Sequence, residues 1–282
     1  YSHFNYKFDS THQSFVLRIS DRTQRKFEAE NSILKRIREI VPVPNVIFEQ
    51  TNNSILGMHI SIQEFVSGEL LSRVDDALSG EEVAELGEQL GEILAKIHSF
   101  EFNQAGFFGA NLVIVEPFSS FEEGYFGFMD NCLSNELLQQ RLGSVLYQKL
   151  LQYIQDNEGI RSSLTKTQCL THSDFNQKNI FVDRVNGSWK VTGVMDWEFA
   201  YSGCPLGDFG NFFRYEDEMS SHYRTPLVES YIKNGGVLEE DWRLKARYLD
   251  LLSMIQFLIR EGDYPKTFQT ARSVIEKTVK SK

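Results

Sequence analysis

The chain has 282 residues, of which 41% are hydrophobic and 24% charged, and its formal net charge is −10. These values are typical of a folded protein of one or two domains, and they argue against a disordered or fibrous chain. The acidic balance argues against a nucleic-acid binder, because phosphate recognition needs a basic surface. No apolar run approaches the roughly 20 residues of a membrane span, and no secretion signal opens the sequence.

The first segment is predicted to form a small mixed lobe. Residues 14–20 are rich in strand formers. A helix is expected over residues 24–39, and the prolines that follow end it, since a proline disfavours helix in the residue before it. Two further strands are expected at residues 46–48 and 59–65. The order of strand, helix, proline break and strands indicates an α+β unit.

A second lobe is expected after a junction at Gly68, so the predicted domains are residues 1–66 and 67–282. The pattern of the second lobe is mostly helical, with helices predicted at residues 79–97, 137–154, 227–233, 241–260 and 266–279. Asn186-Gly187 interrupts this pattern with the strongest short hairpin signal, because both residues tolerate a positive φ. The strand-like segments on either side of it predict a hairpin inside the helical lobe.

The acidic excess is confined to one stretch of the sequence. Residues 61–136 carry 15 acidic and 2 basic side chains, a net charge of −13. Ser79 and Glu82 fit a capping box at the start of a helix, and the carboxylates opposite its apolar stripe have a simple explanation as a solvated face. The remaining carboxylates leave open a surface that attracts cations.

Three cysteines, Cys132, Cys169 and Cys204, are widely spaced and include no CxxC pair. An odd number at such spacing matches neither a disulfide framework nor a zinc site. We therefore expect free thiols in a cytoplasmic protein.

Polar residues around the predicted hairpin suit phosphoryl transfer. Asn179 stands where the hairpin begins, Asp196 where it ends, and Asp174 just upstream. Because a hairpin returns the chain to its starting point, these residues are expected to lie close together. Two carboxylates and an amide oxygen form a hard ligand set that suits a magnesium ion bound to substrate phosphates, with Asp174 free to accept a proton from an attacking hydroxyl. Taken singly, each of these residues has a commoner role in a turn or a helix cap.

The HxDxxxxN spacing from His172 to Asn179, followed by a hairpin and an Asp, resembles the protein-kinase-like superfamily. The surrounding residues 170–182 and 193–200, and then Pro205-Leu-Gly-Asp208, look like the motifs of its aminoglycoside phosphotransferase and choline kinase-like branch. The resemblance implies a two-lobed fold, with a small N-terminal β-sheet lobe containing one helix and a larger, mainly helical C-terminal lobe.

Residue roles follow from this resemblance. It implies that Asp174 is the catalytic base and that Asn179 and Asp196 are the magnesium ligands. It places His172 and Asp208 as supports of the catalytic loop. Apart from the resemblance, His172 is expected to be a buried imidazole bonded to backbone, and Asp208 is expected to have a structural role.

The resemblance extends more loosely to the N-terminal lobe. It implies that Arg18 is the basic residue of the phosphate-binding strand and that Glu30 is its partner on the helix, although both could be solvated surface residues. It implies that the backbone of Glu64 and Val66 forms the interlobe hinge that binds adenine.

Two features depart from the family pattern. Arg18 stands where the family usually has lysine, and the planar guanidinium is not interchangeable with an ammonium. No glycine precedes Gly57, although a phosphate-cradling turn normally uses glycine. We expect that the first strand and glycine-rich loop are missing from this sequence; the alternative is a different mode of nucleotide binding.

The sequence therefore predicts a magnesium-dependent phosphotransferase, a small-molecule kinase that uses ATP or GTP and a hydroxyl acceptor. The acidic stretch suggests a cationic acceptor, but its solvated helix face weighs against that idea. The alternatives are a non-catalytic nucleotide-binding pseudokinase and, more remotely, a hydrolase built on His172 with Ser173 or Cys169.

Oligomeric state cannot be read from the sequence. Three acidic residues after the metal motif could face an acceptor or form a solvated turn: Glu216, Asp217 and Glu218.

Overall fold

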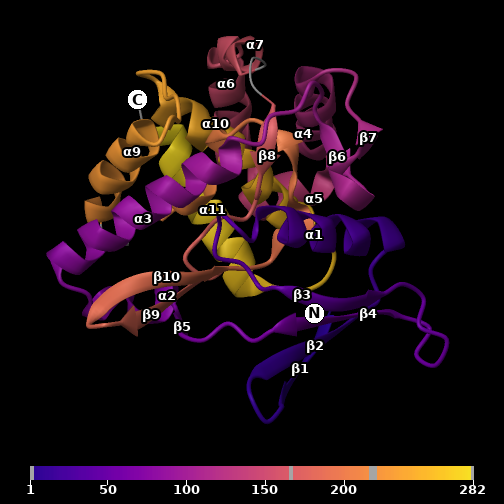
Figure 1. The fold of residues 1–282 in the computed structure, drawn as a ribbon. Coiled ribbons are helices and arrows are strands. Elements are labelled where there is room, and N and C mark those ends of the chain that lie inside the picture. The colour runs from indigo at the N-terminus through magenta and orange to yellow at the C-terminus, as the bar shows by residue number, and fades with distance from the viewer. Residues whose placement is uncertain (1–2, 165–167, 216–220, 281–282) are drawn as a thin grey trace.

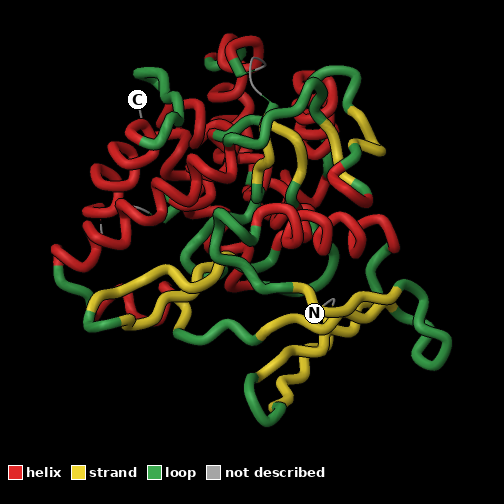
Figure 2. Tube along the Cα trace, viewed as in Figure 1, coloured by secondary structure: helices red, strands yellow, loops and turns green. Residues whose placement is uncertain are grey.

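The structure is a computed structural model that describes residues 3–164, 168–215 and 221–280. Figure 1 shows a small lobe of strands with one helix and a larger lobe built mainly of helices. Figure 2 shows the same view by secondary structure, with most of the strands in the lower part and most of the helices in the upper part. The predicted α+β, two-lobed fold is confirmed. Glu216, Asp217 and Glu218 lie outside the described residues.

The N-terminal lobe is a four-stranded antiparallel sheet in the order β1-β2-β4-β3. Its strands are β1 (His3–Asp9), β2 (Ser14–Ser20), β3 (Val46–Gln50) and β4 (His59–Glu64). The three predicted strands correspond to β2, β3 and β4. Within this sheet one strand, β1, precedes the strand that carries Arg18.

Helix α1 (Gln24–Ile37) lies between this sheet and the C-terminal lobe (Figure 1). Its apolar residues Phe27, Ile33, Leu34 and Ile37 are buried, because they recur on one face at helical spacing. The helix ends a few residues before the prolines that were expected to stop it.

The C-terminal lobe contains the remaining helices. They are α2 (Leu71–Val74), α3 (Gly80–His98), α4 (Gly127–Leu133), α5 (Glu136–Leu142), α6 (Ser144–Asp156), α7 (Gly159–Ser163), α8 (Leu206–Phe212), α9 (Arg224–Lys233), α10 (Trp242–Ile259) and α11 (Pro265–Lys280). The predicted capping box is present at the start of α3, where the Glu82 N–H donates to Ser79 Oγ and the Ser79 N–H donates to the Glu82 carboxylate.

One predicted helix is wrong. Residues 137–154 were expected to form a single helix, but they are divided between α5 and α6 at Gly143. Gly143 has φ of 72°, a left-handed conformation that a helix interior does not contain and that glycine adopts at little cost.

The predicted hairpin consists of β9 (Ile180–Val185) and β10 (Ser188–Val194), which pair antiparallel. Asn186 and Gly187 have φ of 53° and 88°, so both turn residues take the positive values that a two-residue hairpin of this type needs. The short strand β5 (Glu69–Leu70) pairs with β9, next to the connection that leaves the N-terminal sheet. The hairpin is thus fixed beside the junction of the two lobes.

A second small sheet was not predicted. Its order is β7-β6-β11-β8, formed by β6 (Gly106–Phe108), β7 (Ile114–Pro117), β8 (Cys169–Thr171) and β11 (Tyr201–Gly203). Strands of three or four residues are too short to show an alternating pattern, so the sequence contains no signal for them. Strand β8 delivers the chain directly to His172.

Within the described ranges, buried apolar side chains form two clusters. One contains residues of α1 together with residues of α3, β9 and α8, and the other joins α4, α5, α6, α10 and α11. No helix in the described part of the chain combines the length and the apolarity that crossing a bilayer requires.

Candidate functional site

The loop between β8 and β9 holds Asp174 through two amide side chains. Asn179 Nδ2 donates to Asp174 Oδ2 at 2.7 Å and to the Asp174 carbonyl oxygen at 2.9 Å. Asn176 Nδ2 donates to the other carboxylate oxygen, Oδ1, at 2.8 Å. The carboxylate is therefore fixed by one donor on each oxygen.

His172 is fully buried and bonded to backbone on both ring nitrogens, as expected. Its Nε2 lies 2.9 Å from the Met195 carbonyl oxygen, and the Asp174 N–H donates to its Nδ1 at 3.2 Å. Both contacts are satisfied by a neutral ring with its proton on Nε2. The imidazole thereby connects the loop before β9 to the residue that precedes Asp196.

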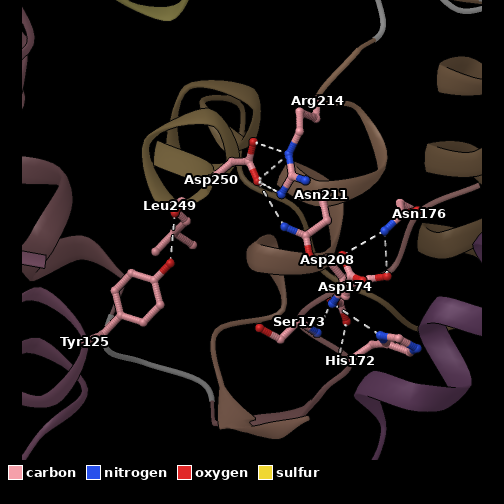
Figure 3. Close-up of polar contacts among 10 residues, drawn as sticks. All are labelled: Tyr125, His172, Ser173, Asp174, Asn176, Asp208, Asn211, Arg214, Leu249 and Asp250. Atoms are coloured by element: carbon pink, nitrogen blue, oxygen red, sulfur yellow. Dashed lines mark hydrogen bonds and ion pairs between the residues drawn. The ribbon is translucent and has the colours of Figure 1, made fainter. Parts of the chain in front are cut away.

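Asp208, on α8, accepts hydrogen bonds from the backbone of the same loop (Figure 3). Its fully buried carboxylate accepts from the backbone N–H of His172 at 2.9 Å and from that of Ser173 at 2.7 Å. His98 Nε2 lies 3.1 Å from Asp208 Oδ2, and His98 Nδ1 lies 3.0 Å from the hydroxyl of Tyr231. These bonds hold Ser173 at φ of 67°, a backbone conformation that costs energy for a non-glycine residue.

Asp196 follows the hairpin in a left-handed conformation with φ of 67°, immediately before the single turn η4 (Trp197–Phe199). The Met195 N–H donates to the Asn179 carbonyl oxygen at 2.8 Å, which holds the two open ends of the hairpin together. The predicted proximity of Asn179 and Asp196 is thus present in the backbone.

The oxygen atoms left over in this arrangement suit a magnesium ion. Within the described residues, the Asp196 carboxylate and Asn179 Oδ1 accept no hydrogen bond and form no ion pair. No group of three or more His, Cys, Asp or Glu side chains suited to a metal occurs among residues 3–164, 168–215 and 221–280. A site with few protein ligands is what magnesium uses when substrate phosphates and waters complete its coordination.

Arg214 and Asp250 form a buried ion pair next to Asn211, in the same region as Asp208 (Figure 3). Arg214 Nε and Nη2 donate to the Asp250 carboxylate at 2.9 and 2.6 Å, and Asn211 Nδ2 adds a third bond at 3.0 Å. Burial opposes the charge of Arg214, but Asp250 outweighs it and raises the Arg214 pKa. Burial also disfavours the charged form of Asp174 and therefore raises the pKa of this carboxyl group. The charge of Arg214 is one of the influences that oppose this rise.

On the N-terminal side, Arg18 of β2 forms an ion pair with Glu30 of α1. Arg18 Nη1 lies 2.7 Å from Glu30 Oε1, and the two side chains are 14% and 6% exposed. Such burial contradicts the alternative of two solvated surface residues.

Glu64 and Val66 lie where the chain passes from the sheet to the second lobe. Glu64 ends β4, and its N–H donates to the Asn45 carbonyl oxygen at 2.9 Å. Val66 packs against Gly193 of β10, since a Cβ placed on that glycine would come within 2.7 Å of Val66 Cγ1. The Val66 N–H donates to no acceptor among the described residues, which leaves it available to a ligand.

Several residues of this region were not predicted as site residues. Asn176 lies inside the recognised motif and could have been identified by its position two residues after Asp174. Arg214 and Asp250 are 36 residues apart, and no local spacing reveals such a pair. Arg22, which forms an ion pair with Glu198, is even more distant from its partner in sequence.

The thiols and Ser173 do not form a hydrolase site. Cys132, Cys169 and Cys204 are free, as expected, and all three are buried. Cys169 Sγ lies 3.6 Å from the Gly203 carbonyl oxygen, and burial raises its pKa well above the ordinary value, which opposes a nucleophilic role.

Comparisons with known proteins identify the family and the fold. The model of the phosphotransferase enzyme family (APH) matches residues 1–244. Aminoglycoside phosphotransferase APH(4)-Ia is 16% identical, with a TM-score of 0.70 over 99% of this chain and 90% of that chain. A thermostable mutant of the same enzyme, in ternary complex with AMP-PNP and hygromycin B, is 17% identical, with a TM-score of 0.72 over 99% and 90% of the two chains.

The GDP and kanamycin complex of APH(2")-IIia is 15% identical, with a TM-score of 0.66 over 98% of this chain and 92% of that chain. Identities this low show the fold alone. The chain matches no curated protein sequence at a significant level. The family match covers most of the chain and includes the whole loop from His172 to Asn179. The chain therefore belongs to the phosphotransferase enzyme family and has the two-lobed fold of the aminoglycoside phosphotransferases.

Proposed function

We propose that this protein is a magnesium-dependent small-molecule kinase that transfers the γ-phosphoryl group of ATP or GTP to a hydroxyl group. One observation carries the proposal. The Asn179 amide donates to the Asp174 carboxylate while its Oδ1 stays unbonded at the end of the hairpin that leads to Asp196. This arrangement provides an oriented base and a place for a cation in one unit, and it favours a kinase over a pseudokinase.

The residues divide the chemistry between them. Asp174 orients the acceptor hydroxyl and receives its proton as the hydroxyl oxygen bonds to the γ-phosphorus and the bond to the leaving nucleoside diphosphate breaks. Asn179 Oδ1 and Asp196 would hold magnesium, which neutralises phosphate charge when bound. Asn176, His172 and Asp208 keep Asp174 in place, and most of the rate enhancement comes from such positioning and electrostatics.

Arg18 and Glu30 support a nucleotide site opposite this loop. Their ion pair orients a partly buried guanidinium, whose planar donors match phosphate oxygens. The hinge residues Glu64 and Val66 would receive the base, and the unbonded N–H of Val66 supports this role. The compared structures include complexes with an adenine nucleotide and with a guanine nucleotide, so the base is left open between ATP and GTP.

The acceptor is proposed to be a small hydroxylated molecule. The compared structures contain hygromycin B and kanamycin, which supports an acceptor of that size. A cationic acceptor remains a proposal based on the acidic stretch, whose carboxylates are partly occupied by basic side chains of other segments.

The test is a nucleotide-consumption screen with ATP and GTP against aminoglycosides, amino alcohols, sugars and amino acids. We expect turnover with at least one acceptor, its loss in EDTA, and a drop of roughly 10²- to 10⁴-fold in Asp174→Asn. Asp183→Asn, which alters a carboxylate of β9 that accepts from the Arg184 N–H, is the matched control and should retain activity. Full activity in Asp174→Asn would contradict the mechanism, and nucleotide binding without any turnover would favour the pseudokinase.

A further inference from the structure

Arg22 connects the two lobes beside the proposed nucleotide site. It lies in the short link between β2 and α1 and forms an ion pair with Glu198 of η4, two residues after Asp196. The two side chains are 13% and 8% exposed. The Arg22 guanidinium also lies 5.8 Å from the centre of the Phe199 ring. A cation of the N-terminal lobe is thereby placed against the segment that carries a proposed magnesium ligand.

The charges that surround Arg22 are those of the proposed nucleotide site. Burial lowers the pKa of Arg22, while the carboxylates of Glu30 and Asp196 oppose that effect and the charge of Arg18 adds to it. These carboxylates thus stabilise the charged guanidinium of Arg22 in a position where water solvates it poorly. A buried cation of this kind needs an anionic partner, and in this structure Glu198 is one.

Arg25 shows what an ordinary interlobe contact looks like in the same region. It also reaches from α1 to the C-terminal lobe, where it pairs with Glu116 at 2.8 Å and donates to the Phe108 carbonyl oxygen at 2.9 Å. Its partners belong to β6 and β7, however, and Glu116 is 55% exposed. Arg25 therefore bridges the lobes without facing the segment around Asp196.

We propose that Arg22 is a second phosphate-binding residue, which exchanges the Glu198 carboxylate for the oxygens of the bound triphosphate. The proposal rests on the proposed function and deepens it. The phosphates supply anionic oxygens, which a guanidinium binds in a bidentate manner. A magnesium ion at Asp196 would add a second positive charge near Arg22, and the phosphates would lie between the two cations. Arg18 remains paired with Glu30, and Arg22 adds a further cation beside the proposed nucleotide site.

Calorimetric titration of the full chain tests this assignment without relying on turnover. The ligands are AMP-PNP with magnesium, or GMP-PNP if the wild type prefers guanine, and the corresponding nucleoside without phosphates. Arg22→Gln should weaken binding of the triphosphate analogue by roughly 10- to 100-fold, the usual range for a lost charge-assisted contact, and leave nucleoside binding unchanged. Arg25→Gln, the matched control, should leave both affinities close to those of the wild type.

The assignment would be overturned if Arg22→Gln lost equal affinity for the triphosphate analogue and the nucleoside, or lost no more affinity than Arg25→Gln. The contact between Arg22 and Glu198 would then be a purely structural ion pair. If Arg22→Gln does not fold, Arg22→Lys serves as the second variant, because it keeps the charge but lacks the planar donors of the guanidinium. It should weaken binding of the triphosphate analogue and leave nucleoside binding unchanged. A wild type that binds neither ligand would instead refute the proposed function, and this inference with it.

Discussion

At the scale of single residues, Asn179 shows what an amide side chain contributes at the end of the proposed catalytic loop. Its Nδ2 is committed to Asp174, while its Oδ1 remains unbonded at the start of the hairpin. One side chain thereby offers a donor to a carboxylate and an acceptor to a cation. An aspartate at this position would offer only acceptors and would place a second negative charge against Asp174, which raises carboxylate pKa values.

The three cysteines allow a prediction at the same scale. Burial raises the pKa of Cys204 to about 12 and also raises those of Cys169 and Cys132. Because the thiolate is the reactive form, a raised pKa keeps these thiols protonated and unreactive at pH 8, and reactivity should increase only as the pH rises toward the raised values. Labelling with DTNB at pH 8 should therefore be slow in the native protein and fast in guanidinium chloride. Rapid labelling of the native protein would show that a thiol is accessible and ionised.

The site residues differ in how far the sequence reveals them. Asp174, Asn179 and Asp196 lie within one stretch around a hairpin, so their spacing was enough to predict their proximity. The partners Arg22 and Glu198, like Arg214 and Asp250, belong to segments far apart in the chain. Their pairing depends on the packing of whole elements, which no local pattern encodes.

At the scale of elements, the predictions succeeded where a pattern extends over several turns. Helices α1 and α3 were recognised by their apolar stripes, and the hairpin by its turn residues. The break between α5 and α6 depends on one residue, Gly143, whose conformation has no periodic signal. The sheet that contains β8 was missed because its strands are short, although it positions His172.

Helix α3 packs closely along α9, and a glycine makes this approach possible. A Cβ on Gly91 would lie 2.2 Å from the Leu227 carbonyl oxygen and 2.9 Å from Ser230 Cβ. Gly91→Ala should therefore destabilise the protein by roughly 1–3 kcal/mol, even though alanine favours helix by up to about 1 kcal/mol.

Gly127→Ala is the matched control for this change. Gly127 begins α4, and a Cβ there meets no atom within 4 Å, so alanine should stabilise the protein by up to about 1 kcal/mol. Urea unfolding of both variants measures the two effects. If Gly91→Ala left the free energy of unfolding unchanged or raised it, α3 and α9 could separate without cost.

At the scale of the whole molecule, the acidic stretch is partly compensated in space. Several carboxylates of residues 61–136 form ion pairs with basic side chains from other segments: Glu82 with Arg184, Glu85 with Lys190, Glu116 with Arg25, and Asp130 with Arg161. The excess of negative charge in the sequence therefore also serves to join elements. Because these carboxylates are paired, the net charge of residues 61–136 overstates the electrostatic attraction that the stretch could exert on a cationic acceptor.

The buried core predicts how the two lobes unfold. Ile33 and Leu34 of α1 belong to the same apolar cluster as Leu86 and Leu90 of α3, so the core continues from one lobe into the other. We expect α1 and α3 to unfold as one cooperative unit, with similar protection of their slowest-exchanging amides.

Hydrogen exchange of two variants tests this expectation. Ile33→Ala removes a fully buried side chain, which typically costs about 2–5 kcal/mol, and it should lower protection in α1 and α3 by the same amount. Ile47→Ala, a change at a half-exposed position of β3, should alter neither helix by more than about 0.5 kcal/mol. If Ile33→Ala lowers the protection of α1 alone, the N-terminal lobe opens independently. The shared core would then not couple the Arg18–Glu30 pair to the loop that holds Asp174.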